Sequence, residues 1–239
     1  MYVNTNELIV ANSILSMIPE PQRRRICEAA TLQELPRGTV LFEADVALCS
    51  VYFFEDGVTA LTVPLREGIS VEASSVGKEG MAGLPLFLNC ESSAFRAVQD
   101  VPGVAYRLAK NVFIDELERG PDLRMMLGRY TQATLNAAGQ RAACNTRHSV
   151  DQRLIRWLLT TDDQVGNRPF ATSHALIAEM LGVRRASVSV AAGLLQDAGY
   201  ITYRRTRFEV TNRLGLEALA CECYDRIRSE FLRNTISAS

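Results

Sequence analysis

The sequence is poor in the side chains that carry catalysis. Its 239 residues include only two histidines, His148 and His174, and a single tryptophan. No Gly-x-Ser-x-Gly segment, no P-loop and no histidine/cysteine metal-ligand spacing occurs along the chain. Because acid–base and metal chemistry need such groups in recognisable patterns, the sequence argues against an enzyme and predicts neither a metal nor a cofactor.

Long apolar runs and a leader are missing as well. A membrane-spanning helix needs about 20 apolar residues, and residues 1–7 place no basic stretch before an apolar run, so no signal peptide is expected. The six cysteines form no Cys-x-x-Cys pair and are expected to be reduced thiols. Cys221 and Cys223 are two apart on an expected helix, so they are interpreted as packing residues on different faces. A cytoplasmic protein that does not touch membranes is predicted.

Positive charge is concentrated in the C-terminal part. The formal net charge is −1, but residues 146–239 carry 13 arginines against 10 acidic residues. Residues 1–145 carry 13 basic against 17 acidic residues. Residues 184–208 contain five arginines and one acidic residue, Asp197. A locally basic segment on a nearly neutral chain favours a DNA-binding module attached to a sensor, and argues against a protein that coats nucleic acid generally.

Residues 171–201 have the pattern of a helix-turn-helix. The first helix is expected to begin at a Thr172/Ser173 cap, with the small Ala178 where a second helix crosses closely. Gly182 ends this helix and supplies the turn. The second helix buries apolar residues at helical spacing and stops at Gly199. Two amphipathic helices in an ordinary core would explain each residue alone but not the joint pattern, which predicts entry into the DNA major groove.

The second helix exposes its N-terminal end, where base contacts are expected. One of Arg184 and Arg185 is expected to bind a phosphate and the other a guanine. Arg185 is the candidate for the guanine contact. A two-stranded wing follows, with an arginine-rich tip suited to phosphates. His174 is expected to face solvent or a DNA phosphate. The predicted DNA-contact set is Ser173, His174, Arg184, Arg185, Ala186, Ser187, Ser189, Val190, Arg204, Arg205 and Arg207.

The first half of the chain has the spacing of a β-domain. A short helix is expected over residues 19–30, and Asp56-Gly57 is expected to form a hairpin turn. Many short strands at regular spacing predict a small barrel or jelly roll. The expected strands are 39–42, 51–54, 58–63, 69–75, 94–99 and 103–108.

From residue 109 the pattern becomes helical. The expected elements are a short helix at 111–119, a long helix from about 122 to 143, a hinge at 145–148, a helix at 150–160 and a closing helix at 214–233. The long helix could pack on its own barrel, but a helix between two modules favours dimerisation, because symmetric operators need a two-fold protein. The predicted dimer seam is Leu123, Met126, Tyr130, Ala133 and Ala137.

This order of elements resembles the Crp/Fnr superfamily of bacterial transcription regulators over essentially the whole chain. The resemblance is strongest at 173–210, where the Ile-Ala-x-x-Leu-Gly core and Leu195, Gly199 and Ile201 fall where the family has them. It implies an α+β fold with a double-stranded β-helix (jelly-roll) sensor at 1–108, a dimerisation region at 109–144 and a winged helix-turn-helix at 145–239. It also implies a homodimer on a palindromic operator of double-stranded DNA, with RNA polymerase and an unidentified small-molecule effector as further partners.

The sequence departs from several patterns of that family. Ser92-Ser93 stand where the cyclic-nucleotide-binding branch has an Arg-Ser/Thr pair for the phosphate, and Arg96 comes a few positions late. Without such a partner the phosphate loses its main recognition contact, so cyclic AMP is not expected to bind. The cysteine cluster of the iron–sulfur branch and a sensor histidine for haem are both missing. Ala186 and Val190 replace the Glu and the second Arg of the family's Arg-Glu-x-x-x-Arg, which predicts a different operator.

Two other functions compete with DNA binding. One is an enzyme, against which the missing motifs argue. The other is a β-roll ligand-sensing or protein-interaction module whose helix-turn-helix does not read DNA. The basic tip at 204–207 argues against this module, since phosphates need such charges and most protein partners do not.

Overall fold

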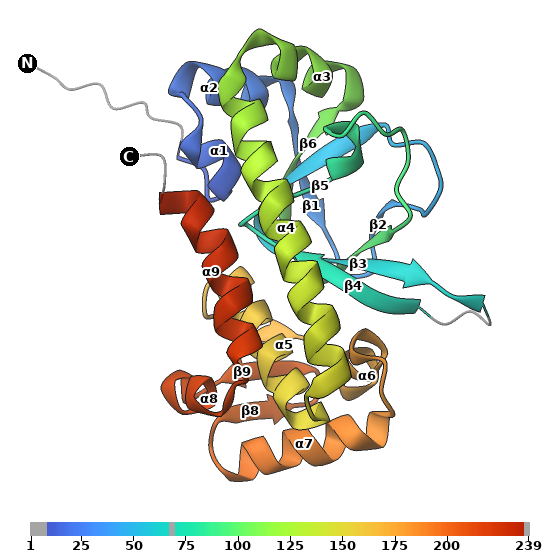
Figure 1. Ribbon diagram of the computed structural model, residues 1–239, viewed down its shortest axis with the longest axis vertical. Helices are drawn as coiled ribbons and strands as arrows, with labels where there is room; N and C mark the ends of the chain where they lie inside the picture. The colour runs from blue at the N-terminus through green and yellow to red at the C-terminus, as the bar shows by residue number, and fades with distance from the viewer. Residues whose placement is uncertain (1–8, 67–69, 237–239) are drawn as a thin grey trace, which may run out of the picture.

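The computed structural model describes residues 9–66 and 70–236, and Figure 1 shows a β-rich body and a smaller helical body joined by one long helix. The prediction about a leader at 1–7 and the expected strand start at Ile69 lie outside the described residues. No described helix combines the length and the apolar content that a membrane span requires.

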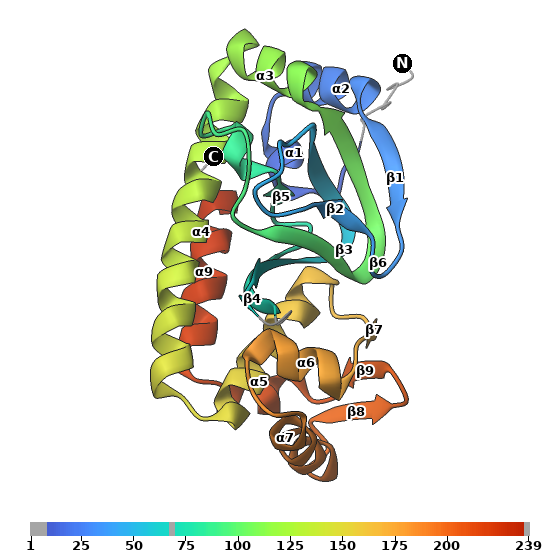
Figure 2. The ribbon, with the colours of Figure 1, turned by 90° about the vertical axis from the view of Figure 1, so that its right-hand side faces the viewer.

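The N-terminal body is a rolled antiparallel sheet preceded by two short helices (Figure 2). The strand order is β1-β6-β3-β4, while β2 pairs with β6 and β5 pairs with β3. This agrees with the predicted α+β class and with the rolled sheet. The elements are α1 (Ser13–Met17), α2 (Glu20–Ala29), β1 (Thr31–Leu35), β2 (Val40–Phe42), β3 (Ser50–Pro64), β4 (Ser70–Val76), β5 (Met81–Ala82) and β6 (Arg96–Ala109).

Strands β3 and β6 are each continuous where the sequence predicts two shorter strands. The β3–β6 register shifts between Phe54 and Asp56 and again between Asp56 and Val58, and Gly57 has φ of +83°. Asp56-Gly57 is therefore a β-bulge rather than the predicted hairpin turn. Gly103 lies opposite the bulge, and a Cβ at that position would overlap the backbone of Asp56 and Gly57. The bulge lets one long strand bend around the roll without a break in pairing.

The helical connection and the C-terminal body differ from the prediction at two places. Helix α4 is helical through Arg147, with His148 as its C-cap, so the expected hinge at 145–148 begins as helix. The closing helix is two helices separated at Ala220 and Cys221. The elements are α3 (Lys110–Arg119), α4 (Pro121–Arg147), α5 (Val150–Gln164), β7 (Phe170–Ala171), α6 (His174–Leu181), α7 (Arg185–Asp197), β8 (Ile201–Arg204), β9 (Arg207–Val210), α8 (Arg213–Leu219) and α9 (Glu222–Ile236).

The two bodies share packing rather than being joined only by α4. Val58, Ala60 and Val101 of the roll belong to the same buried cluster as Leu154 and Ile177 of the C-terminal body. Helix α9 runs beside α4 back toward the roll, as both ribbon views show. The division at residues 108 and 144 therefore stays an interpretation of the sequence, because core contacts cross it.

Candidate nucleic-acid interface

The helix-turn-helix is formed by α6 and α7. The Ser173 side chain caps α6 by accepting a hydrogen bond from the Leu176 amide at 3.2 Å. Gly182 ends the helix in the left-handed region, with φ of +61°, a conformation that glycine adopts without steric cost. The Val183 amide then bonds the Ala178 carbonyl at 2.9 Å, which fixes the turn into α7. The local chain therefore folds as the sequence predicts.

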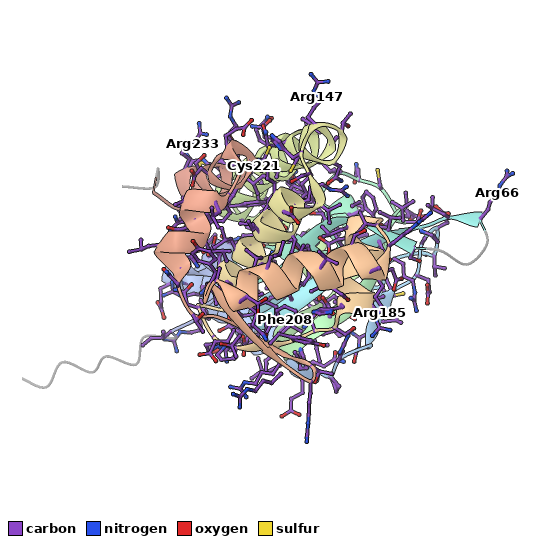
Figure 3. All side chains as sticks on the ribbon, turned by 90° about the horizontal axis from the view of Figure 1, so that it is seen from below. Arg66, Arg147, Arg185, Phe208, Cys221 and Arg233 are labelled. Carbon is purple, nitrogen blue, oxygen red and sulfur yellow. The ribbon has the colours of Figure 1, made fainter. Side chains whose placement is uncertain are left out.

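Helix α7 buries one face and presents the other at the end of the molecule farthest from α3 (Figure 1). The buried face consists of Val188, Ala191, Ala192 and Leu195. Among the predicted contact residues, Arg184, Arg185, Ala186 and Val190 are exposed and Ser187 is half-buried. Viewed from below, α7 crosses the surface with Arg185 near one end and the wing hairpin beside it (Figure 3).

The wing is a β8–β9 hairpin to which β7 adds a third strand that the sequence did not predict. The sheet order is β7-β9-β8. Arg205 turns the chain with φ of +57°, a conformation that is uncommon for a residue with a side chain. The predicted tip arginines are all exposed: Arg204, Arg205 and Arg207. No acidic residue forms an ion pair with them among the described residues, so the tip is a compact patch of positive charge beside α7.

His174 and Ser189, two residues of the predicted contact set, are half-buried and contact each other. The Nδ1 atom of His174 lies 3.0 Å from the Ser189 hydroxyl, and the imidazole stacks on Tyr203 with ring centroids 4.4 Å apart. Burial, assisted by the charge of Arg185, lowers the pKa of His174. A neutral, packed imidazole is a poor partner for a phosphate. The two side chains connect α6, α7 and the wing, and their DNA contacts stay a prediction from the sequence.

The predicted dimer seam faces the interior of the chain. The exposed fractions of Leu123, Met126, Tyr130, Ala133 and Ala137 are between 0% and 6%. The Tyr130 ring lies 6.2 Å from that of Phe231 on α9, and its hydroxyl reaches the Met81 carbonyl at 3.4 Å. These five residues, the inward stripe, therefore pack α4 on the roll and on α9. They are not available to a second chain, which corrects the prediction.

A different face of α4 is open to solvent and was missed in the sequence. Leu135 is 66% exposed and Met125 is 48% exposed. A Cβ added at Gly128 or Gly139 would meet nothing within 4 Å, so no element of the described residues packs at these two positions. The exposed positions alternate in steps of three and four, the spacing of a helix–helix seam. This outward stripe is Met125, Gly128, Gln132, Leu135, Gly139 and Ala142.

The roll offers no free arginine at the expected phosphate position. The Ser93 hydroxyl accepts a hydrogen bond from the Phe95 amide at 3.0 Å. Arg96 Nε donates to the Glu43 carboxylate at 2.9 Å. A cavity of about 470 Å³ lies between the two bodies and is bordered by α1, α5 and α9. Charged residues of both signs line it, including Lys78, Glu79 and Arg141.

Comparisons with known proteins match this geometry. Residues 152–219 match the family model described as the Crp-like helix-turn-helix domain, whereas no curated protein matches the sequence. The structure of FixK2 from Bradyrhizobium japonicum has 18% identity and a TM-score of 0.69, covering 80% of this chain and 98% of that chain. A CRP-family transcriptional regulator from Thermus thermophilus has 18% identity and a TM-score of 0.65, covering 79% of this chain and 96% of that chain.

A third similar structure is the c-di-GMP responsive global regulator CLP from Xanthomonas campestris. It has 14% identity and a TM-score of 0.62, and the match covers 80% of this chain and 99% of that chain. The chain therefore has a Crp-like helix-turn-helix domain on the fold of Crp/Fnr regulators. The predicted resemblance and fold class are confirmed.

Proposed function

We propose that this chain is a transcription regulator that binds double-stranded DNA in a sequence-specific manner, as a homodimer on a palindromic operator. The observation that carries the proposal is the joint exposure of the α7 N-terminal end and the arginine-rich wing tip on one face of a Crp-like helix-turn-helix. Major-groove entry by the second helix, with backbone contacts beside it, is how such motifs bind DNA. A regulator of this kind would act in the cytoplasm, with RNA polymerase as a further partner.

In this proposal the arginine at the start of α7 contacts a base, and the arginines of the wing contact phosphates. Arg185 is in the first turn of α7, where side chains reach base edges, so it pairs with a guanine. Arg184 precedes the helix and binds a phosphate, as do the wing arginines. Ser187 hydrogen-bonds a base or a phosphate, and Ala186 or Val190 contacts a thymine methyl. Ser173 is the α6 cap at the groove edge, where its backbone meets the DNA.

The homodimer forms through the outward stripe of α4. Gly128, Gly139 and Ala142 are small, so a second copy of α4 can approach closely, and Met125 and Leu135 supply exposed apolar surface. A parallel pair of α4 helices related by a two-fold axis places two copies of α7 at the same end of the assembly. That arrangement matches a palindromic site.

The second candidate function is a protein-binding module. One observation favours it: Val190 and Leu194, on the exposed side of α7, are 66% and 61% exposed. Apolar groups of this kind suit a protein partner as well as thymine methyls. Electrostatics separates the two functions, because phosphate contacts make the affinity fall steeply with salt and an apolar contact does not.

The effector, where one acts, binds in the cavity between the bodies rather than at a cyclic-nucleotide phosphate site. The cavity borders both the roll and α9, so a ligand bound there can shift the position of the C-terminal body relative to the roll. Cyclic AMP is not expected to bind, since no arginine stands at the Ser92-Ser93 position and Arg96 is paired with Glu43. Calorimetry with cyclic AMP is expected to give no saturable heat, and a micromolar binding curve would contradict this assignment.

The test of DNA binding starts with site selection from random duplexes, or genome-wide mapping of bound sites in the native cell. The selected site is then used in gel shifts at several salt concentrations. Arg24→Ala on α2, at the opposite end of the molecule (Figure 1), is the matched control for each arginine variant. Enrichment of an inverted repeat and a steep salt dependence support the proposal. A chain that retains no duplex at low salt would refute it.

A further inference from the structure

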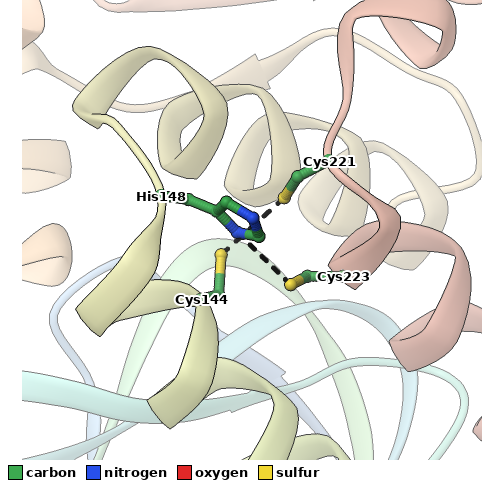
Figure 4. Close-up of side chains that lie close together, drawn as sticks. All are labelled: Cys144, His148, Cys221 and Cys223. Carbon is green, nitrogen blue, oxygen red and sulfur yellow. Dashed lines mark hydrogen bonds between the residues drawn. The ribbon is translucent and has the colours of Figure 1, made fainter.

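Three cysteines and a histidine from distant parts of the sequence meet at the lower end of α4. Cys144 is in its last turn, His148 is its C-cap, Cys221 immediately precedes α9, and Cys223 lies in the first turn of α9. Figure 4 shows the four side chains directed toward one point. Their ligand atoms all lie within 4.8 Å of one another. We call these four residues the Cys/His cluster.

Two distances within the cluster match those of a tetrahedral metal site. Metal–sulfur bonds of about 2.3 Å and metal–nitrogen bonds of about 2.0–2.1 Å place two sulfurs about 3.8 Å apart, and a sulfur and a nitrogen about 3.5 Å apart. The Cys144 and Cys221 sulfurs are 3.8 Å apart. The Cys223 sulfur lies 3.5 Å from Nδ1 of His148. With every other pair of ligand atoms within 4.8 Å, small side-chain movements would place the four donors around one ion.

Local structure explains the convergence and corrects the interpretation of Cys221 and Cys223 as residues on different helix faces. That interpretation assumed one closing helix, but the chain leaves α8 at Ala220 and starts α9 only at Glu222. Cys221 is therefore outside the helix and can turn toward Cys223. On the other side, the His148 amide bonds the Cys144 carbonyl at 3.0 Å, which closes the last turn and brings both side chains to one face.

Side chains around the Cys/His cluster can hydrogen-bond to the cysteine sulfurs and offset their negative charge when they bind a metal as thiolates. Gln140 Nε2 donates to the Cys223 sulfur at 3.0 Å, and His148 Nε2 lies 3.6 Å from the Glu222 carboxylate, which leaves Nδ1 directed at the cluster. Arg156 is only 5% exposed, lies beside Cys144 and, among the described residues, forms no ion pair with a carboxylate. Hydrogen bonds to thiolates and a carboxylate behind a histidine are common around protein-bound metals.

We propose that Cys144, His148, Cys221 and Cys223 form a Cys₃His site for one Zn²⁺ ion. Binding replaces three thiol protons, which pass to solvent, by three sulfur–metal bonds, and Nδ1 of His148 supplies the fourth ligand. The resulting centre carries one net negative charge, which the Arg156 guanidinium offsets. The cysteines are between 0% and 5% exposed, so all four positions are filled by protein and the site is structural rather than catalytic.

The site would fix the junction between α4 and the C-terminal body. His148 is the residue at which the chain turns from α4 into α5, and Cys221 and Cys223 begin the helix that returns along α4. Zinc would hold these segments together at one point. Its loss would remove one of the connections between α4 and the start of α9, beside the Tyr130–Phe231 contact farther along, and would loosen the position of α7 relative to the long helix. The site does not depend on DNA binding and is tested without DNA.

The experiment measures metal content and ligand type on the full chain. Purified protein is reduced, stripped with a chelator, and reloaded with Zn²⁺ or with Co²⁺ alone. We expect about one zinc per chain, a higher thermal midpoint after reloading, and the visible and sulfur-to-cobalt charge-transfer bands of a tetrahedral thiolate site. Cys223→Ser and His148→Ala are expected to lower zinc affinity at least tenfold, as loss of a ligand should.

Two exposed cysteines outside the cluster provide matched controls. Cys49→Ser and Cys90→Ser are expected to bind zinc as the parent does. If Cys223→Ser does not fold, the cobalt spectrum of the parent still decides, because a Cys₃His ligand set has its own bands. Reduced parent that takes up no zinc would overturn the proposal, as would zinc retained with parental affinity in His148→Ala. Formation of only a Cys144–Cys221 disulfide in air, without metal uptake after reduction, would also overturn it.

Discussion

Replacing Leu135 by arginine is expected to separate the dimer into folded monomers. Leu135 lies in the middle of the outward stripe of α4 and is 66% exposed in the single chain. Its substitution removes apolar surface from the proposed seam and places two positive charges face to face across the two-fold axis. Since the described residues leave two thirds of the Leu135 surface exposed, the fold of each monomer should be unaffected.

The size of the effect follows from the exposed fraction. Complete burial of a leucine side chain stabilises by about 1.5–3 kcal/mol. With 66% of its surface still available, Leu135 contributes about 1–2 kcal/mol per copy and about 2–4 kcal/mol per dimer. At 1.4 kcal/mol for each factor of ten, the dimer Kd is expected to rise about 30- to 700-fold, before any charge repulsion is added.

Sedimentation equilibrium over a range of concentrations measures that Kd, and thermal unfolding checks the fold. Leu214→Arg is the matched control, because Leu214 on α8 is 81% exposed and lies away from the stripe. Ala137→Arg is the contrasting variant: Ala137 is fully buried on the inward stripe, so a charge there should unfold the chain rather than release monomers.

Two results would refute this reasoning. One is a parent that sediments as a monomer at micromolar concentration, which would remove the dimer itself. The other is a Leu135→Arg variant whose Kd equals that of the parent while the thermal midpoint is unchanged, which would place the interface on another surface. Loss of folding in Leu135→Arg would contradict the assignment of Leu135 to an uncovered face.

Three further predictions address DNA readout, pH and the bulge. Arg185→Ala should weaken binding to the operator by about 1–3 kcal/mol and remove the preference for one base pair in each half-site. Arg207→Ala should weaken binding to operator and scrambled DNA alike and lower the salt slope by about one per subunit. The opposite outcome in gel shifts would show that the wing reads the base sequence. Burial raises the pKa of Asp100 from 3.8 to about 7. Between these values the folded chain keeps the Asp100 proton and the unfolded chain releases it, so the free energy of unfolding should fall as the pH rises from about 4 to about 7. Asp100→Asn should remove that fall and stabilise the chain at pH 8 by up to about 4 kcal/mol in denaturant melts, and an unchanged pH profile would contradict the shift. Gly103→Ala should destabilise the roll by about 1–3 kcal/mol in the same melts, because its Cβ overlaps the backbone of Asp56, and a parental midpoint would show that the bulge can relax.

The helix-turn-helix could be predicted because its signals are local. Ser173 and Gly182 act within a few residues of their own positions, through a helix cap and a left-handed turn. The structure reproduces each of them. His174 was different, because its partners Ser189 and Tyr203 come from two other elements. A histidine in the first turn of a helix looks solvent-exposed unless the position of the wing is known.

The roll was predicted as a class but not strand by strand. Asp-Gly between apolar runs is the usual mark of a hairpin, and the sequence alone does not distinguish it from a bulge in one long strand. The distinction rests on the neighbour: β6 continues past the bulge with Gly103 opposite it, and only a glycine leaves room there. This is information about pairing, which the residues of β3 do not contain.

The two remaining errors have one physical cause, the return of α9 along α4. Helix α4 carries two interleaved stripes with steps of three and four, and either could be the covered one. Which stripe turns inward depends on the side that α9 occupies, and Phe231 settles it by packing on Tyr130. The same return brings Cys221 and Cys223 to Cys144, and Cys221 is 77 residues from Cys144 in the sequence. Spacing rules detect ligands that are neighbours on one element, so a site that exists only after two distant helices dock escapes them. A variant that detaches α9 should therefore abolish metal binding and expose the inward stripe together.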